Sequence, residues 1–130
     1  MSKLLARAKA KKSSAENSYN NMSLDDAYID ECCFNLQQAI EFTLKYLVEM
    51  AGEHYIENHD IRAQMNKLKK LDKYFPCEQQ LRAMASTINS WEVDTRYNDN
   101  FVALLEDIDD AMKIADELIE YCEQQVKVVD

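Results

Sequence analysis

The sequence predicts an all-α fold, an up-and-down antiparallel bundle of four to five helices. Glycine and proline occur once each in the 130 residues, whereas β-rich and α/β folds need many tight turns. Apolar residues recur at steps of three and four over long segments, which is the period of a helix with one buried face. A chain of this length is expected to form one domain, residues 1–130, with its core in about 20–127.

The first half of the chain predicts two helices. The first is expected over about residues 2–20, and the second runs from about Asp25 to Gly52. Ser23 is expected to cap the second helix, and Gly52 suits the left-handed position that ends one. The apolar face of the second helix consists of Cys33, Leu36, Ile40, Leu44, Leu47 and Ala51.

The second half predicts three further helices. Asn58 is expected to cap a helix whose apolar side begins at Ile61, and a fourth helix is expected after Pro76. Residues 96–100 contain several turn-forming residues and are expected to form a loop. The apolar stripe of the fourth helix is Leu81, Met84, Ala85, Ile88 and Trp91. The stripe of the last helix is Val102, Leu105, Ile108, Met112, Ala115, Ile119, Cys122 and Val126. Its opposite, acidic face is interpreted as solvated, not as a metal site.

Charge is distributed unevenly along the chain. The net charge is −9, yet residues 1–15 hold five basic residues and no acid, which leaves about −14 for the remainder. A region as acidic as residues 16–130 should repel the phosphate backbone of a nucleic acid unless basic groups cluster locally. A small ligand in a local basic pocket remains compatible with this charge.

No motif for a metal, a cofactor or a phosphate-binding loop is found. The four cysteines form no CxxC pair and are interpreted as buried, reduced thiols of a cytoplasmic protein. One glycine cannot build a glycine-rich phosphate loop, and no Glu-x-x-His pair for a di-iron bundle occurs. No apolar run is long enough to span a membrane.

Three short elements together resemble the HEPN family, helical bundles named for higher eukaryotes and prokaryotes nucleotide-binding. They are Leu36-Gln37-Gln38-Ala39 with Glu41 and Lys45, His59-Asp60-Ile61, and Arg96-Tyr97. The catalytic HEPN ribonucleases carry Arg followed, after four to six residues, by His. Here that window, residues 101–103, reads Phe-Val-Ala. The resemblance therefore implies the HEPN architecture without this metal-independent ribonuclease activity, which stays only a third hypothesis.

The resemblance also implies partners and site residues. It implies a non-catalytic interaction module, a homodimer, and pairing with a minimal nucleotidyltransferase in a toxin–antitoxin-like system. In that case Tyr97 would be the acceptor of a transferred nucleotide. The alternative is a nucleotide- or RNA-binding cleft around Arg96, Tyr97, Lys45 and His59. A structural role remains open for each: His59 can bond a neighbouring helix, and Lys45 can pair with Glu41.

Overall fold

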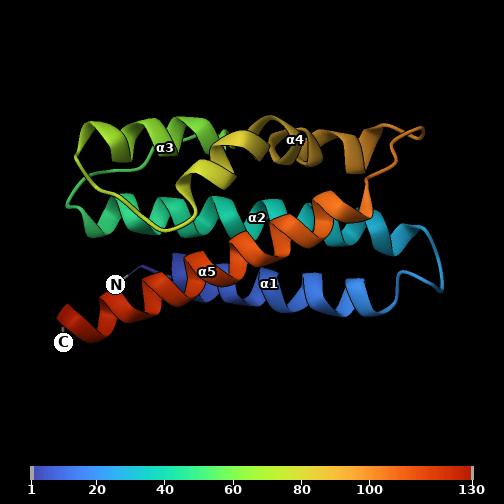
Figure 1. The fold of residues 1–130 in the computed structure, drawn as a ribbon, viewed down its shortest axis with the longest axis horizontal. Coiled ribbons are helices and arrows are strands. Elements are labelled where there is room, and N and C mark those ends of the chain that lie inside the picture. Colours follow the sequence, from blue (N-terminus) through green and yellow to red (C-terminus); the bar gives the residue numbers. More distant parts are fainter. Residues whose placement is uncertain (1, 130) are drawn as a thin grey trace.

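The computed structural model describes residues 2–129, with side chains through Val126, and helices are the regular secondary structure of this part of the chain. The helices are α1 (Leu4–Asn20), α2 (Ala27–Met50), α3 (Ile61–Lys70), α4 (Glu78–Tyr97) and α5 (Leu105–Val129). In Figure 1, α2 lies centrally, with α1 on one side, α3 and α4 on the other, and α5 crossing obliquely. The predicted all-α bundle is confirmed.

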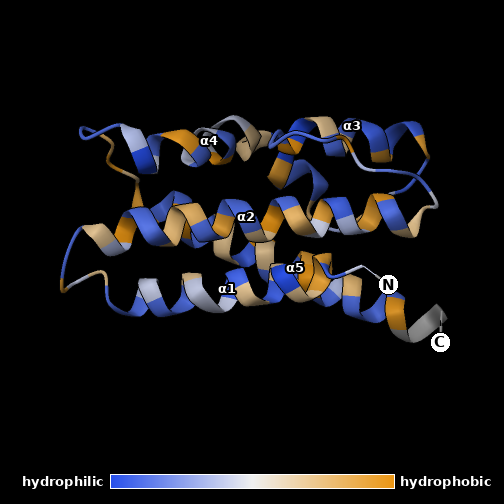
Figure 2. Ribbon diagram, turned by 180° about the vertical axis from the view of Figure 1, so that it is seen from behind, coloured by the Kyte–Doolittle hydropathy of each residue, from blue (hydrophilic) through white to orange (hydrophobic). Residues whose placement is uncertain are grey.

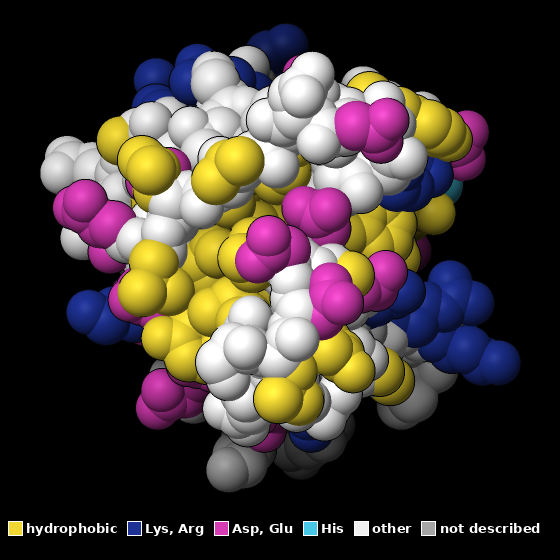
Figure 3. Space-filling model, turned by 90° about the vertical axis from the view of Figure 1, so that its right-hand side faces the viewer, with side chains coloured by type: hydrophobic (Ala, Val, Ile, Leu, Met, Phe, Trp, Pro, Cys, Tyr) yellow, Lys and Arg dark blue, Asp and Glu magenta, His cyan; other side chains and the backbone are white. Residues whose placement is uncertain are grey.

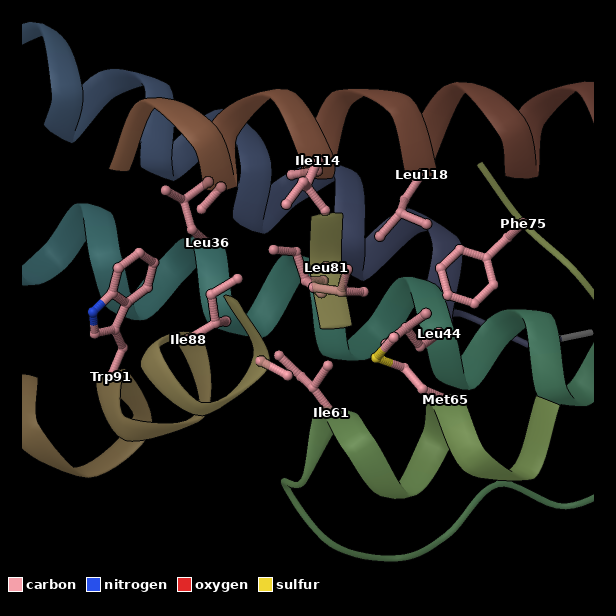
Figure 4. Packing of buried hydrophobic residues seen from close by; sticks show 14 of the residues in the cluster. Leu36, Leu44, Ile61, Met65, Phe75, Leu81, Ile88, Trp91, Ile114 and Leu118 are labelled. Carbon is pink, nitrogen blue, oxygen red and sulfur yellow. The ribbon is translucent and has the colours of Figure 1, made fainter. Parts of the chain in front are cut away.

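The core forms around α2, which packs against each of the other four helices. Leu36, Ile40 and Leu44 of α2 are fully buried, as the helical period predicts. Figure 4 shows side chains from α3, α4 and α5 converging on this helix, among them Met65, Trp91 and Leu118. Trp91 is 1% exposed, so it is a core residue.

α1 is held partly by polar contacts with α5. Figure 2 shows α1 as a mostly hydrophilic ribbon, whereas hydrophobic residues recur along α2. Lys12 forms ion pairs with Glu16 and Asp116, and the Tyr19 hydroxyl donates to an Asp109 carboxylate oxygen at 2.7 Å. The acidic face of α5 is therefore partly paired with the basic first helix.

The connection between α2 and α3 runs back along α2. Gly52, with φ +84°, ends α2 in the predicted left-handed conformation, and the Gly52 and Glu53 amides bond the carbonyls of Glu49 and Val48. Two residues of this connection contact α2: Tyr55 lies against Lys45, and His59 lies against Glu41. Ten residues, 51–60, therefore connect the two helices along the side of α2.

Both predicted N-caps lie at the wrong residue. Ser23 is followed by further turns, and the Asp25 carboxylate accepts from the Ala27 amide at the start of α2. At α3 the cap is Asp60, which accepts from the Arg62 amide at 2.9 Å. Asn58 instead accepts from the Asp60 amide, so it shapes the turn before the cap.

The expected loop at residues 96–100 begins later than predicted. α4 continues through Tyr97 because Arg96, in its last turn, pairs with Glu92 four residues earlier. Conversely, α5 begins only at Leu105. Val102 and Leu105 are 81% and 54% exposed, so the predicted apolar stripe of α5 is buried only from Ile108 onward.

Candidate functional site

A row of polar residues is buried along α2. Gln37, Glu41 and Lys45 follow one another at steps of four and therefore share one side of the helix. Glu41 is 1% exposed and accepts hydrogen bonds from the Gln37 amide at 3.0 Å and the Lys45 ammonium at 3.1 Å. The His59 Nδ1 lies 3.0 Å from the same carboxylate. We name these four residues the Glu41 cluster.

The charges of the Glu41 cluster balance one another. The Lys45 ammonium lies 4.8 Å from the Tyr55 ring centroid, so the returning segment covers it with an aromatic face. A buried carboxylate and a buried ammonium are costly alone, and pairing them offsets that cost. The cluster therefore ties residues 55–59 to α2. The expected contacts of His59 with a neighbouring helix and of Lys45 with Glu41 are present, but Lys45, expected to be solvated, is 7% exposed because Tyr55 covers it.

A second set of cations surrounds one aromatic ring near the start of α2. The Arg96 guanidinium lies 5.3 Å from the Phe34 ring centroid, and the Lys11 ammonium lies 5.9 Å from it. Arg96 also donates to the Glu92 carbonyl at 2.8 Å. Its side chain remains 42% exposed. We name Lys11, Phe34 and Arg96 the Arg96 cluster, which brings α1, α2 and α4 together.

Tyr97 projects beside the Arg96 cluster into an apolar surface. The Arg96 guanidinium lies 5.1 Å from the Tyr97 ring, and Tyr97 itself is 72% exposed. Figure 3 shows hydrophobic side chains gathered on this end of the molecule. We name this surface the end patch; its exposed members are Leu24, Val93, Tyr97, Val102, Leu104 and Leu105.

The structure separates the four predicted site residues into two pairs. Lys45 and His59 meet at Glu41, whereas Tyr97 lies against Arg96, which lies over Phe34. Phe34 and Glu41 are seven residues apart on one helix, which is about 10 Å of axial rise. Within residues 2–126, no hydrogen bond, ion pair or cation–π contact joins the two pairs, so the structure brings the four residues together only two by two.

Sequence reasoning missed the residues that hold these pairs together. Phe34 and Lys11 of the Arg96 cluster were not predicted, and nor was Tyr55, which covers Lys45. Contacts between segments that are distant in the sequence do not affect local periodicity. A signal for the Glu41 cluster was present. Polar residues at 37, 41 and 45 interrupt the otherwise apolar surface of a long helix at a constant step of four.

The cysteines are unsuited to nucleophilic chemistry. All four are free, and Cys32, Cys33 and Cys122 are buried. Burial raises the pKa of Cys122 to about 12, and burial together with the Asp109 charge does the same for Cys32, so both stay protonated near neutral pH. Across the described part of the chain, no three His, Cys, Asp or Glu residues are placed to hold a metal ion. Nor does any helix there have the length and hydrophobicity to cross a membrane.

Comparison with known proteins agrees with the architecture. The HEPN domain family model matches residues 1–125. No curated protein and no solved structure matches the chain. The match covers all five helices up to the last turn of α5, and it includes the three sequence elements that resemble this family, which is linked to nucleotides and RNA. The chain therefore belongs to the HEPN domain family.

Proposed function

We propose that the protein is a HEPN interaction module that pairs with a minimal nucleotidyltransferase and presents Tyr97 to it. The end patch is the surface that this partner would cover. Large apolar side chains that are more than half exposed are unusual when gathered on one end of a small domain, and such patches mark binding sites for other proteins. The exposure of Tyr97 within this surface is the observation that carries the proposal.

The proposed modification is a nucleotidyl transfer from ATP to the Tyr97 hydroxyl. The phenol oxygen would attack the α-phosphorus of ATP held by the transferase, forming a new oxygen–phosphorus bond. Pyrophosphate would leave with the electron pair of the broken bond, and the phenol proton would pass to a base of the transferase. The Arg96 guanidinium, next to the ring, is placed to attract the phosphate that arrives there.

Mass spectrometry tests this proposal. The protein is incubated with ATP and a cognate minimal nucleotidyltransferase, and we expect the added mass of one AMP on the peptide containing Tyr97. Tyr97→Phe should remove the modification. Tyr74→Phe is the matched control, since Tyr74 is similarly exposed at 67% but lies outside the end patch. An unmodified Tyr97, or modification lost equally in both variants, would refute the assignment.

The resemblance further suggests a homodimer, and the proposal includes it. Since Tyr97 must stay accessible, the two copies would meet through helix faces away from the end patch. Light scattering on the purified protein should give twice the chain mass of 15.1 kDa. Val102→Glu, in the end patch, should leave that mass unchanged while weakening capture of the transferase. Conversion to a monomer by Val102→Glu would show that the patch is the dimer interface instead.

The Arg96 cluster favours a second candidate function, nucleotide binding. Two cations lie over the half-buried Phe34 ring and the exposed Tyr97 lies against one of them, Arg96, which suits a phosphate group and an aromatic base. Calorimetric titration with ATP should then give saturable heat that Arg96→Ala abolishes. Lys45→Gln should not affect this heat directly, because Lys45 belongs to the Glu41 cluster. Absence of heat with the wild-type protein would eliminate this candidate.

A further inference from the structure

Basic residues are concentrated on α3 and the turn that follows it. Residues 61–73 contain five of them, Arg62, Lys67, Lys69, Lys70 and Lys73, and a single acid, Asp72. Arg62 lies beside α4, where it donates to the Ser86 hydroxyl at 3.2 Å. The buried side of α3 consists of Ile61, Gln64, Met65 and Leu68, so the lysines lie toward the opposite side. α3 packs only against α2 and α4 and lies at an outer edge of the bundle, which leaves that side uncovered (Figures 1 and 2). We name these five residues the α3 basic face.

The lysines of the α3 basic face lack acidic partners. Within residues 2–126, neither Lys67, Lys69, Lys70 nor Lys73 forms an ion pair. Several basic residues elsewhere are paired, among them Lys9 with Glu123, Lys12 with Asp116 and Arg96 with Glu92. In an acidic protein, unpaired positive charge on one helix creates a local field of the opposite sign, which attracts polyanions.

A small cavity adjoins the basic face at the end of α3. It has a volume of about 170 Å³, and its walls include Met50, Lys73, Tyr74, Phe75 and Tyr121. Tyr74 is 67% exposed, and the Tyr121 hydroxyl donates to the Tyr74 carbonyl at 3.1 Å. Aromatic walls beside a lysine provide a stacking surface for a base whose phosphates lie on neighbouring cations.

We propose that the α3 basic face binds the phosphate backbone of a single-stranded polynucleotide, with one base stacked on Tyr74 at the cavity. The site is separate from the Arg96 cluster and from the end patch, so it does not depend on the function proposed above. α3 is about 15 Å long, which matches a few nucleotides of an extended strand. RNA and DNA strands share the backbone chemistry that the lysines recognise, and the ribose 2′-hydroxyl distinguishes them.

Fluorescence anisotropy tests the proposal on the full chain. The probes are labelled oligouridine and oligodeoxythymidine of about 12 nucleotides, titrated over a series of salt concentrations. We expect binding at low salt that weakens as salt rises, with a slope of log K against log[salt] near −3 for four or five phosphate contacts. Tighter binding of the RNA probe would identify RNA as the ligand, and tighter binding of the other would identify DNA.

Two variants with equal charge loss separate the α3 basic face from general electrostatics. K69Q/K70Q/K73Q should reduce the magnitude of the slope by about 2 and weaken binding at low salt at least tenfold. R7Q/K9Q/K113Q removes three positive charges from α1 and α5, outside both clusters, and should bind like the wild type. Tyr74→Ala should weaken binding about tenfold without changing the slope, because stacking releases no counterions.

Three results would overturn the proposal. They are absence of binding to either probe at low salt, equal loss in the two triple variants, and unchanged affinity in Tyr74→Ala. Sedimentation with vesicles that contain anionic lipid compares binding to a membrane surface with binding to the oligonucleotides. Lysine-dependent binding to vesicles without binding to either oligonucleotide would assign the α3 basic face to a membrane surface and reject the polynucleotide.

Discussion

The Glu41 cluster and the Arg96 cluster each place a cation over an aromatic ring, but they differ in burial. Glu41 is 1% exposed and satisfies both Lys45 and His59, and Tyr55 covers Lys45. Arg96 pairs with Glu92 on its own helix and remains 42% exposed over Phe34. One cluster has its charges satisfied inside the molecule, and the other leaves a guanidinium accessible to a ligand.

This difference distinguishes a structural polar cluster from a candidate binding site. A buried ion pair constrains the fold, because removing one partner strands the other charge in a poorly solvated place. A partly exposed cation costs little to place and can exchange its contacts for those of a ligand. The resemblance to HEPN domains alone could not make this distinction between Lys45 and Arg96.

Breaking the Glu41 cluster should have the largest effect on stability. Glu41→Ala leaves Lys45 buried without its acidic partner and should lower the free energy of unfolding by about 3 kcal/mol or more. Glu92→Ala, which removes the partner of the exposed Arg96, should cost less than about 1 kcal/mol. Urea denaturation measures both. Equal losses in the two variants would contradict the contrast between the clusters.

Replacing both buried charges should recover much of that loss. In E41L/K45M the two apolar side chains have volumes similar to those of the side chains they replace, and neither leaves an unpaired charge. The free energy of unfolding of this variant should therefore lie within about 2 kcal/mol of the wild-type value. Urea denaturation of the double variant against each single variant completes the cycle. A double variant no more stable than E41L alone would show that the pairing contributes little.

Removing the histidine should have a moderate effect. His59→Ala loses the contact with Glu41 and loosens the returning segment, but Lys45 keeps its partner. We expect a loss of about 1 kcal/mol in the free energy of unfolding. Proteolysis should become faster at residues 53–60, and His54→Ala, in the same segment but paired only with the exposed Glu57, is the control. Equal cleavage of the two variants would argue against an anchoring role for His59.

The smallest effect on stability is expected at Arg96. Arg96→Ala removes an exposed ion pair and a contact with Phe34, which together should contribute about 1 kcal/mol or less. Thermal unfolding measures this change, and Arg82→Ala is the control, since Arg82 pairs with Glu78 at the same spacing of four residues. A loss as large as that of Glu41→Ala would place Arg96 among the structural residues.

Much of the fold could be predicted from the sequence because helical periodicity is local. The buried residues Leu36, Ile40 and Leu44 follow from steps of four along α2. Helix ends were less predictable, since Asp25 and Asp60, which accept from the first amides of α2 and α3, lie two residues beyond the equally suitable Ser23 and Asn58. The candidate site was predicted in part. The individual residues were named, but their separation into two clusters depends on which segments pack together.

The sequence by itself determined the helical class, the central helix α2 and the absence of histidine in the window after Arg96, because composition, period and spacing are properties of the chain alone. Only the tertiary structure decided that Lys45 is satisfied and Arg96 accessible. The reason is that the segment at residues 53–60 returns along α2 and covers Lys45, whereas α4 ends at the surface. The tertiary structure also placed the lysines of α3 on an uncovered edge of the bundle. Burial and pairing, not residue type, determine which charged side chains can bind a ligand.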